Sequence, residues 1–300
     1  MIYTVTLNPA IDYIVHLDEL KNGAINRSRA EECFFGGKGI NVSNVLRTLG
    51  LDTVALGFVA GFTGEGLEKG LQRLGLATRF LHLENGMTRI NVKVKAGQET
   101  EINGTGPLIT PADMDRLYAQ LDEIRSGDTL VLSGSIPGCL PSDTYAGILA
   151  RLENKGILTV VDATKELLVS TLKHRPFLIK PNNHELGEIF GVTPVTDEEI
   201  AVCAGKLQRL GARNVLVSMA GDGALLLDEH GAVHRMGCPK GRVLNSVGSG
   251  DSMVAGFLAG YLQTGAYDQA LKLGTAAGSA TAFSLGLADR DAINALLAEI

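Results

Sequence analysis

The segment 245–257 (NSVGSGDSMVAGF) combines a glycine-rich turn, a carboxylate and the start of an apolar helix pattern. Gly248, Ser249 and Gly250 are small enough for the backbone to approach a ligand, and the first N–H groups of a helix lack intrahelical acceptors. Such a helix start binds a phosphate or a developing anion. Asp251 follows, where its carboxylate could accept the proton of a bound hydroxyl. The segment predicts phosphoryl transfer, with helix capping by Asp251 as the alternative.

The position of Asp251 also predicts that it is a weak base, because the positive end of a helix lowers the pKa of a nearby carboxylate. A loose phosphoryl-transfer transition state tolerates a weak base, since the hydroxyl loses its proton late. The better-known phosphate and nucleophile motifs are incomplete. Lys38 is followed by Gly39 rather than Ser or Thr, Met253 stands where a dinucleotide motif needs its last glycine, and no G-x-S-x-G segment occurs.

A second glycine-rich segment, GGKGIN, opens a predicted helix. Gly36 and Gly37 would bring a sugar close to backbone amides, Asn41 can bond two hydroxyls, and Lys38 adds a positive charge. The alternative is a flexible turn with a solvated lysine.

Other candidates lie near the first strand and a predicted hairpin. Asn8 and Asp12 follow the first strand, where Asp12 could accept hydrogen bonds from sugar hydroxyls or could simply be a turn residue. Arg89 begins the hairpin and could clamp a substrate phosphate, with Arg27 as a further basic residue nearby. A solvated arginine is the alternative.

Two segments favour a nucleotide with its metal ion. Lys180 opens the segment KPNNHE, in which Asn182 and Glu185 would share one helix face and suit water-mediated Mg²⁺ binding. A helix-capping pair is an equal alternative. A glycine turn after the next strand could pass beneath adenine or ribose, or be a plain turn, and it contains Ser218, Gly221 and Gly223.

Apolar runs alternate with helix-period segments along most of the chain. We predict strands at 2–7, 52–59, 128–132, 157–161, 177–179 and 214–218. We predict helices at 39–49, 65–74, 111–124, 142–154, 197–210, 251–263, 267–283 and 289–299. This alternation indicates an α/β fold with a parallel sheet covered on both faces. Ligands of such folds bind at the carboxyl ends of the strands.

Three stretches depart from this rhythm. Residues 12–35 are polar without a clear helix, 87–103 alternate like a hairpin turning at Ala96-Gly97, and 225–236 form a second hairpin turning at His230-Gly231. A strand pair outside the α/β rhythm suggests a flap over the ligand edge, with an edge hairpin of no special role as the alternative. We therefore expect one domain over 1–300, with a β lid formed by about 12–35 and 87–104.

Composition and charge favour a globular protein and argue against one that binds nucleic acid. The chain has 300 residues, of which 45% are apolar, so it is globular rather than disordered. A net charge of −6 argues against nucleic acid as a partner, whereas small anions can still bind at local basic groups. The four cysteines lack metal-site spacing, no signal peptide is visible, and no apolar run could span a membrane. These features predict a cytoplasmic enzyme.

The segments at 36–46 (GGKGINVSNVL) and 245–257 resemble the paired signatures of the ribokinase-like carbohydrate kinase family. LNPAID, TRINVK, TEIN, SGSIPG and KPNNHEL also occur in the family's order, so the resemblance covers essentially the whole chain. It implies a ribokinase-like three-layer α/β/α fold with a mostly parallel central sheet and a small β-sheet lid.

The resemblance also implies ATP-dependent phosphorylation of a sugar or sugar phosphate with Mg²⁺. Asp251 matches the catalytic base and 248–250 the anion hole, with Ser249 where many members have Ala. Implied substrate contacts are Asn8, Asp12, Gly36, Gly37, Asn41 and Ser135, with Arg27, Lys38 and Arg89 on the substrate phosphate. Implied ATP contacts are Lys180, Ser218, Gly221, Gly223, Gly248 and Gly250, and the implied metal-binding pair is Asn182 and Glu185.

Within this family, the motifs favour fructose 1-phosphate as the acceptor, phosphorylated at its 6-hydroxyl to fructose 1,6-bisphosphate. Tagatose 6-phosphate or fructose 6-phosphate as acceptor, and a sugar-phosphate sensor without catalysis, stay open as alternatives. The exposed strand edges of the hairpin could pair with a second copy, so a homodimer through the β lid is expected.

Overall fold

The computed structural model describes all of residues 1–300. In it, the apolar runs of the sequence form one large, mostly parallel sheet. Its strand order is β14-β13-β12-β11-β10-β9-β1-β4-β5, with β6 also paired to β4, and only the pairs formed by β13 are antiparallel. The strands are β1 (Ile2–Thr6), β4 (Thr53–Ala60), β5 (Ala77–Thr78), β6 (Leu81–Leu83), β9 (Thr129–Ser133), β10 (Leu158–Asp162), β11 (Leu178–Ile179), β12 (Asn214–Ser218), β13 (Ala224–Leu227) and β14 (Val233–Met236).

Helices cover both faces of this sheet, because side chains of its central strands alternate between two apolar cores. Val217 packs into the larger core with α3, α4, α5, α6 and α7, while its neighbour Leu216 packs into the other with α1, α8, α9 and α10. The helices are α1 (Lys38–Thr48), α2 (Gly61–Arg73), α3 (Pro111–Asp122), α4 (Thr144–Arg151), α5 (Lys165–Thr171), α6 (Asn183–Phe190), α7 (Asp197–Leu210), α8 (Ser249–Thr264), α9 (Tyr267–Ala282) and α10 (Arg290–Leu297). The predicted α/β fold is confirmed.

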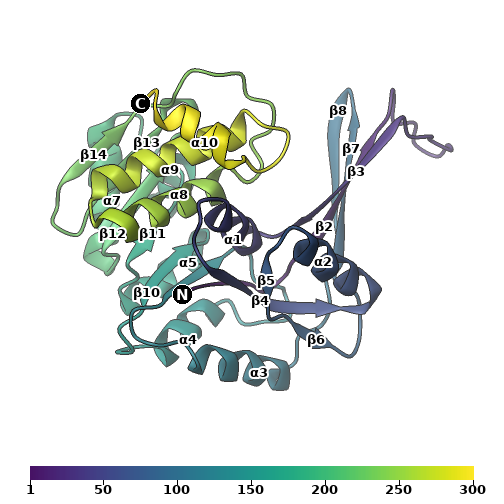
Figure 1. Cartoon of the computed structure of the whole chain (residues 1–300), viewed down its shortest axis with the longest axis horizontal. Helices are drawn as coiled ribbons and strands as arrows, with labels where there is room; N and C mark the ends of the chain where they lie inside the picture. Colours follow the sequence, from purple (N-terminus) through teal and green to yellow (C-terminus); the bar gives the residue numbers. More distant parts are fainter.

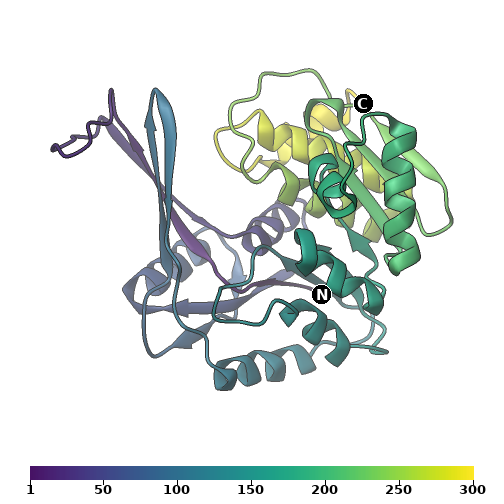
Figure 2. The same ribbon diagram turned by 180° about the vertical axis from the view of Figure 1, so that it is seen from behind.

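A second, four-stranded sheet projects from this three-layer body (Figure 1), and Figure 2 shows the same separation from behind. Its order is β3-β2-β7-β8, formed by β3 (Ala30–Gly36), β2 (Ala10–His16), β7 (Arg89–Ala96) and β8 (Gln98–Asn103). The predicted hairpin is thus present, with Gly97 at its turn in the left-handed region that favours glycine (φ 68°).

The sequence analysis assigned residues 12–35 to the β lid but gave no bounds for β2 and β3, which lie largely within that polar stretch. Charged residues interrupt the apolar pattern of both strands, and in β3 Glu31 and Glu32 put charges on opposite faces, so the alternation that predicts a half-buried strand is weak. The short elements α5, β5 and β6 were also missed, because two to seven residues are too few to show a period. The hairpin at 225–236 is present as β13 and β14.

Close packing of α8 against α9 fixes the position of the α8 N-terminus. A Cβ atom on Gly256 would lie 2.6 Å from the Leu273 carbonyl oxygen and 2.9 Å from Ala277 Cβ, so only glycine fits. Gly274 of α9 also approaches α8 closely, with its Cβ position 3.0 Å from the Met253 carbonyl oxygen. None of the helices is long and apolar enough to cross a membrane.

We predict that Gly256→Ala destabilises the protein by about 1–3 kcal/mol, because the added methyl overpacks the contact between α8 and α9. Gly66→Ala in α2 is the matched control, since nothing lies within 4 Å of its Cβ position. There the higher helix propensity of alanine should stabilise the protein by about 0.5–1 kcal/mol. Urea unfolding of both variants measures the difference, and equal effects would contradict the packing argument.

Candidate active site

A cavity of about 830 Å³ opens between the carboxyl ends of the large sheet's strands and the small sheet. Asp12 and Arg89 reach it from the small sheet, Lys38 and Asn41 from the start of α1, and Asp251 from the start of α8. The other sequence-predicted residues that line it are Gly37, Lys180, Asn182, Glu185, Ser218, Gly221, Gly223, Gly248, Ser249 and Gly250. Residues from distant parts of the chain therefore meet in one space.

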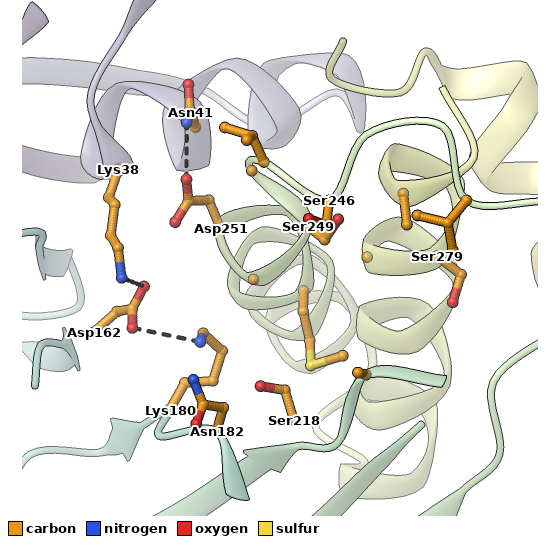
Figure 3. Close-up of a pocket in the computed structure, with 18 of the residues that line it drawn as sticks. Lys38, Asn41, Asp162, Lys180, Asn182, Ser218, Ser246, Ser249, Asp251 and Ser279 are labelled. Atoms are coloured by element: carbon orange, nitrogen blue, oxygen red, sulfur yellow. Dashed lines mark hydrogen bonds and ion pairs between the residues drawn. The ribbon is translucent and has the colours of Figure 1, made fainter. Parts of the chain in front are cut away.

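Asp251 lies on the inner wall of this cavity, as Figure 3 shows, with its side chain directed toward α1. It is 5% exposed, and Asn41 Nδ2 donates a 2.8 Å hydrogen bond to its Oδ2. Burial, with a further contribution from the charge of Asp162, raises the pKa of Asp251 to about 6. The expectation that the helix start makes Asp251 a weak base was wrong, because burial outweighs the helix dipole.

A buried carboxylate that the sequence analysis missed organises the cations of the site. Asp162, 1% exposed at the end of β10, lies 3.4 Å from Lys38 Nζ on one side and 3.4 Å from Lys180 Nζ on the other (Figure 3). Burial works to raise the pKa of Asp162, but the two ammonium groups outweigh it and hold that pKa below its ordinary value. In return, Asp162 raises the pKa of Lys38. An acid directly after an apolar strand was the signal that could have found it.

The start of α8 has the properties of an anion site. Its N-cap residue, Gly248, is in the left-handed region (φ 83°), and no side chain caps the helix. A Cβ on Gly250 would lie 3.1 Å from Lys180 Nζ, so the glycine leaves room for the ammonium beside the free N–H groups. The buried Oγ of Ser249 also has no hydrogen-bond partner. Backbone dipole and lysine together favour a bound phosphoryl group here.

The small sheet supplies the polar groups at the other end of the cavity. Asn91 Nδ2 donates a 2.9 Å hydrogen bond to Asp12 Oδ1, and Arg89 Nε donates to the Asn8 carbonyl oxygen at 3.2 Å. Burial lowers the pKa of Arg89 from its ordinary value, although a guanidinium remains charged. Asn91 was not among the predicted residues.

Four predicted substrate residues lie beside the main cavity or apart from it. Asn8 and Ser135 line an adjoining cavity of about 260 Å³, which also contacts Lys38 and Arg89. Gly36 lines a cleft of about 950 Å³ with Asp12. Arg27 is exposed in the loop between β2 and β3 and lines none of these three spaces. Within one chain, Arg27 therefore does not lie with the other predicted substrate residues.

Asn182 and Glu185 form a reciprocal cap on α6, which is the structural alternative considered for them. Asn182 Oδ1 accepts from the Glu185 N–H at 2.7 Å, and Glu185 Oε2 accepts from the Asn182 N–H at 2.9 Å. The second carboxylate oxygen of Glu185 remains able to accept, and Glu185 lines the cavity. These residues fit Mg²⁺ held through water rather than by direct amide ligation.

The turn predicted to contact a nucleotide lies at one end of the cavity, together with lining residues that sequence reasoning missed. Gly223, with φ 92°, follows the short helical turn η2 (Ala220–Asp222), and its Cβ position lies 2.1 Å from the Met236 carbonyl oxygen, so only glycine fits. The missed lining residues come from the loop after β14, from α9 and from the residue that follows α9, and they include Cys238, Thr275, Gly278, Ser279, Ala282 and Phe283. The sequence analysis predicted a helix over 267–283 but assigned no ligand contact to it.

The α/β fold places a carboxylate beside an uncapped helix start and close to two lysines. This combination is typical of a phosphotransferase. The model of the pfkB family carbohydrate kinases matches residues 5–292, and the chain belongs to this family. The chain is 47% identical over 300 residues to a 1-phosphofructokinase of Bacillus subtilis (strain 168), covering 100% of this chain and 98% of the relative.

Two further comparisons bear on the substrate. A D-tagatose-1-phosphate kinase of Bacillus licheniformis is 38% identical over 290 residues, covering 96% of this chain and 95% of that protein. The crystal structure of phosphofructokinase-2 from Escherichia coli in complex with fructose-6-phosphate superposes with a TM-score of 0.91 at 27% identity, covering 99% of this chain and 98% of that one. The tagatose relative is named for a 1-phosphate, whereas the sequence analysis considered the 6-phosphate.

We predict that Asp251→Asn stabilises the folded protein at pH 8. The native pKa of Asp251, about 6, lies above the ordinary value near 3.8, so the native state binds the proton more tightly than the unfolded state. Stability therefore falls as pH rises between those values, and the variant escapes a penalty of about 1–3 kcal/mol above pH 6. Its advantage should vanish toward pH 4 in urea unfolding.

Asp128→Asn is the control of opposite sign. Burial works to raise the pKa of Asp128, but the Arg125 N–H and the N-terminal ammonium lower it overall. Removing this carboxylate should decrease stability at pH 8. A decrease for Asp251→Asn as well would show that the buried charge of Asp251 is not destabilising.

Proposed function

We infer that this chain transfers the γ-phosphoryl group of ATP to the 6-hydroxyl of fructose 1-phosphate, giving fructose 1,6-bisphosphate and ADP. The full-length relatedness to a 1-phosphofructokinase supports the acceptor. The observation that carries the chemistry is the buried Asp251, held by Asn41 at the uncapped start of α8. A base and an anion site are thus adjacent within one cavity.

In the proposed reaction, Asp251 accepts the proton of the acceptor hydroxyl as the oxygen attacks phosphorus. A pKa near 6 leaves Asp251 ionised at neutral pH while making it a stronger base than an ordinary aspartate. The N–H groups at 249–251 would stabilise charge on the transferred group, and Lys180 would add a positive charge from the opposite side of Gly250. Asn41 orients the carboxylate throughout.

We propose that Mg²⁺ accompanies ATP and is held at the nucleotide phosphates through water bound to Glu185. The metal would neutralise charge on the phosphates. Ser218, Gly221 and Gly223 would contact the nucleotide from the turn after β12, which the bridge between Asn182 and Ser218 ties to the α6 cap. The family's kinase activity supports ATP as the co-substrate.

We propose that residues 1–300 act as one domain whose small sheet is a lid and also a dimer surface. Side chains alternate across the sheet, so the face opposite Asp12 and Asn91 carries Tyr13, Ile90 and Ile102, which are 38%, 38% and 62% exposed. A second copy covering this apolar face would support a homodimer. The four cysteines are free thiols, which supports the cytoplasm as the compartment.

A tagatose phosphate is the second candidate acceptor, favoured by the D-tagatose-1-phosphate kinase relative. Fructose 6-phosphate has weaker support as the acceptor, since the Escherichia coli structure in complex with it is only 27% identical to this chain. A sensor without catalysis is disfavoured by the buried, oriented Asp251. A panel of these phosphosugars with ATP, read by ADP release, tests the proposal: fructose 1-phosphate should give the highest kcat/KM, and absence of turnover with every sugar would support the sensor.

We predict that Asp251→Ala lowers kcat by about 10²–10⁴-fold with little change in sugar affinity, as for loss of a general base. In the wild type, kcat/KM should fall tenfold per pH unit below an apparent pKa of about 6, because protonated Asp251 cannot accept a proton. Steady-state kinetics between pH 5 and 8 measure both. Near-normal turnover of the variant would remove Asp251 from the mechanism.

We predict that Arg89→Ala raises KM for fructose 1-phosphate much more than KM for ATP, because Arg89 would pair with the substrate phosphate. Free fructose, which lacks that phosphate, serves as the comparison substrate. Arg79→Ala is the matched control, since Arg79 pairs with Glu123 on the surface. Equal losses with fructose and fructose 1-phosphate would show that Arg89 does not bind the phosphate.

A further inference from the structure

A second polar cavity lies at the edge of the large sheet opposite the candidate active site. It has a volume of about 410 Å³, and its lining includes Arg175, Arg209 and Arg213. Arg213 directly precedes β12, whereas Ser218, which lines the active-site cavity, ends that strand. A strand rises about 3.3 Å per residue, so the two ends of β12 lie about 13 Å apart. The two cavities share no lining residue and lie at opposite ends of the same strand.

Close packing of two chain turns brings the arginines together. Arg175 follows the short helical turn η1 (Leu172–His174), and Arg209 lies in the last turn of α7. Gly211 begins the loop after α7, and a Cβ atom there would collide with the Leu172 carbonyl oxygen, so only glycine permits this approach. The end of α7 is thereby held against η1, and the arginines of both elements line one cavity.

Arg213 is fixed in this cavity by contacts on two sides. Its Nε and Nη2 atoms donate to the two carboxylate oxygens of Glu229 at 2.7 and 3.1 Å, and the Tyr267 hydroxyl donates to the same carboxylate at 2.7 Å. The guanidinium carbon of Arg213 also lies 5.2 Å from the centre of the Phe177 ring. Arg213 therefore neutralises Glu229, the only acidic residue that lines the cavity.

The other two arginines carry charges that no carboxylate of the protein compensates. Neither Arg175 nor Arg209 forms an ion pair or a side-chain hydrogen bond, although the chain as a whole has a net charge of −6. Arg175 also has a left-handed backbone (φ 52°), a conformation more usual for glycine or asparagine. Three arginines and one carboxylate leave the lining with a charge of +2. A concave surface concentrates such a field and attracts anions.

We propose that this cavity binds a phosphate group through Arg175 and Arg209, either as free phosphate or as the phosphate of a small ester. Planar guanidinium groups pair with phosphate oxygens through two parallel N–H···O bonds, a geometry that arginine provides and lysine does not. A volume of about 410 Å³ suits a small molecule rather than a nucleic acid segment. The site is separate from the proposed kinase activity and does not depend on it.

The test is calorimetric titration of inorganic phosphate and of fructose 1,6-bisphosphate at constant ionic strength. Arg175→Asn/Arg209→Gln should weaken the binding of at least one of these probes by about 10- to 100-fold, because each charge-assisted hydrogen bond that is lost costs about a factor of ten or more. Both side chains are exposed, and asparagine suits the left-handed backbone at position 175, so the variant should fold.

The two probes distinguish the two sources of phosphate. An equal loss of affinity for both probes identifies free phosphate as sufficient, and a larger loss for fructose 1,6-bisphosphate identifies an ester as the ligand. Any binding of the probes at the active site is common to the wild type and the variant. Only the difference between the two proteins therefore reports on the arginine-lined cavity.

Arg125→Gln/Arg290→Gln is the charge-matched control, since both of these arginines are exposed and line neither this cavity nor the active site. It changes the net charge by the same amount and should bind both probes as the wild type does. The proposal is overturned if Arg175→Asn/Arg209→Gln binds both probes as tightly as the wild type. It is also overturned if the control loses as much affinity, because general surface charge would then account for the binding.

Discussion

The site depends on holding two carboxylates and two ammonium groups together out of water. Asp162 stays ionised because Lys38 and Lys180 flank it at equal distances, and its negative charge contributes to the raised pKa of Asp251. Removing either lysine would leave a buried charge less compensated. This arrangement shifts the pKa values of two aspartates in one cavity in opposite directions: that of Asp162 is lowered, and that of Asp251 is raised to about 6.

The scaffold that holds these charges is a set of chain turns at one edge of the large sheet. Asp162 ends β10, Lys180 follows β11, Ser218 ends β12, and Asp251 starts a helix that small residues lock against α9. Because these strands are parallel, their carboxyl ends share one edge, and groups far apart in sequence become neighbours. The packing of α8 on α9 matters for chemistry because it sets where the free N–H groups point.

The small sheet forms one wall of the cavity and has two unlike faces. One face presents Asp12, Arg89 and Asn91 to the cavity, and the other presents an apolar surface that includes Tyr13 and Ile102. Because successive side chains of a strand point to opposite sides, adjacent residues of the same strands supply the two faces. Substrate binding and the proposed subunit contact are therefore built on a single element, which would couple a shift at one face to the other.

The sequence alone determined the alternation of strands and helices, the hairpin turning at Gly97 and the glycine-rich helix start before Asp251, because period and turn chemistry are local properties. It could not determine that Asp162 joins Lys38 and Lys180, that Asn91 supports Asp12, or that α9 lines the cavity, since each depends on contacts between distant segments. The pKa of Asp251 shows the difference most clearly. Its position at a helix start predicts a lowered pKa, whereas burial in the assembled cavity and the nearby charge of Asp162 raise it.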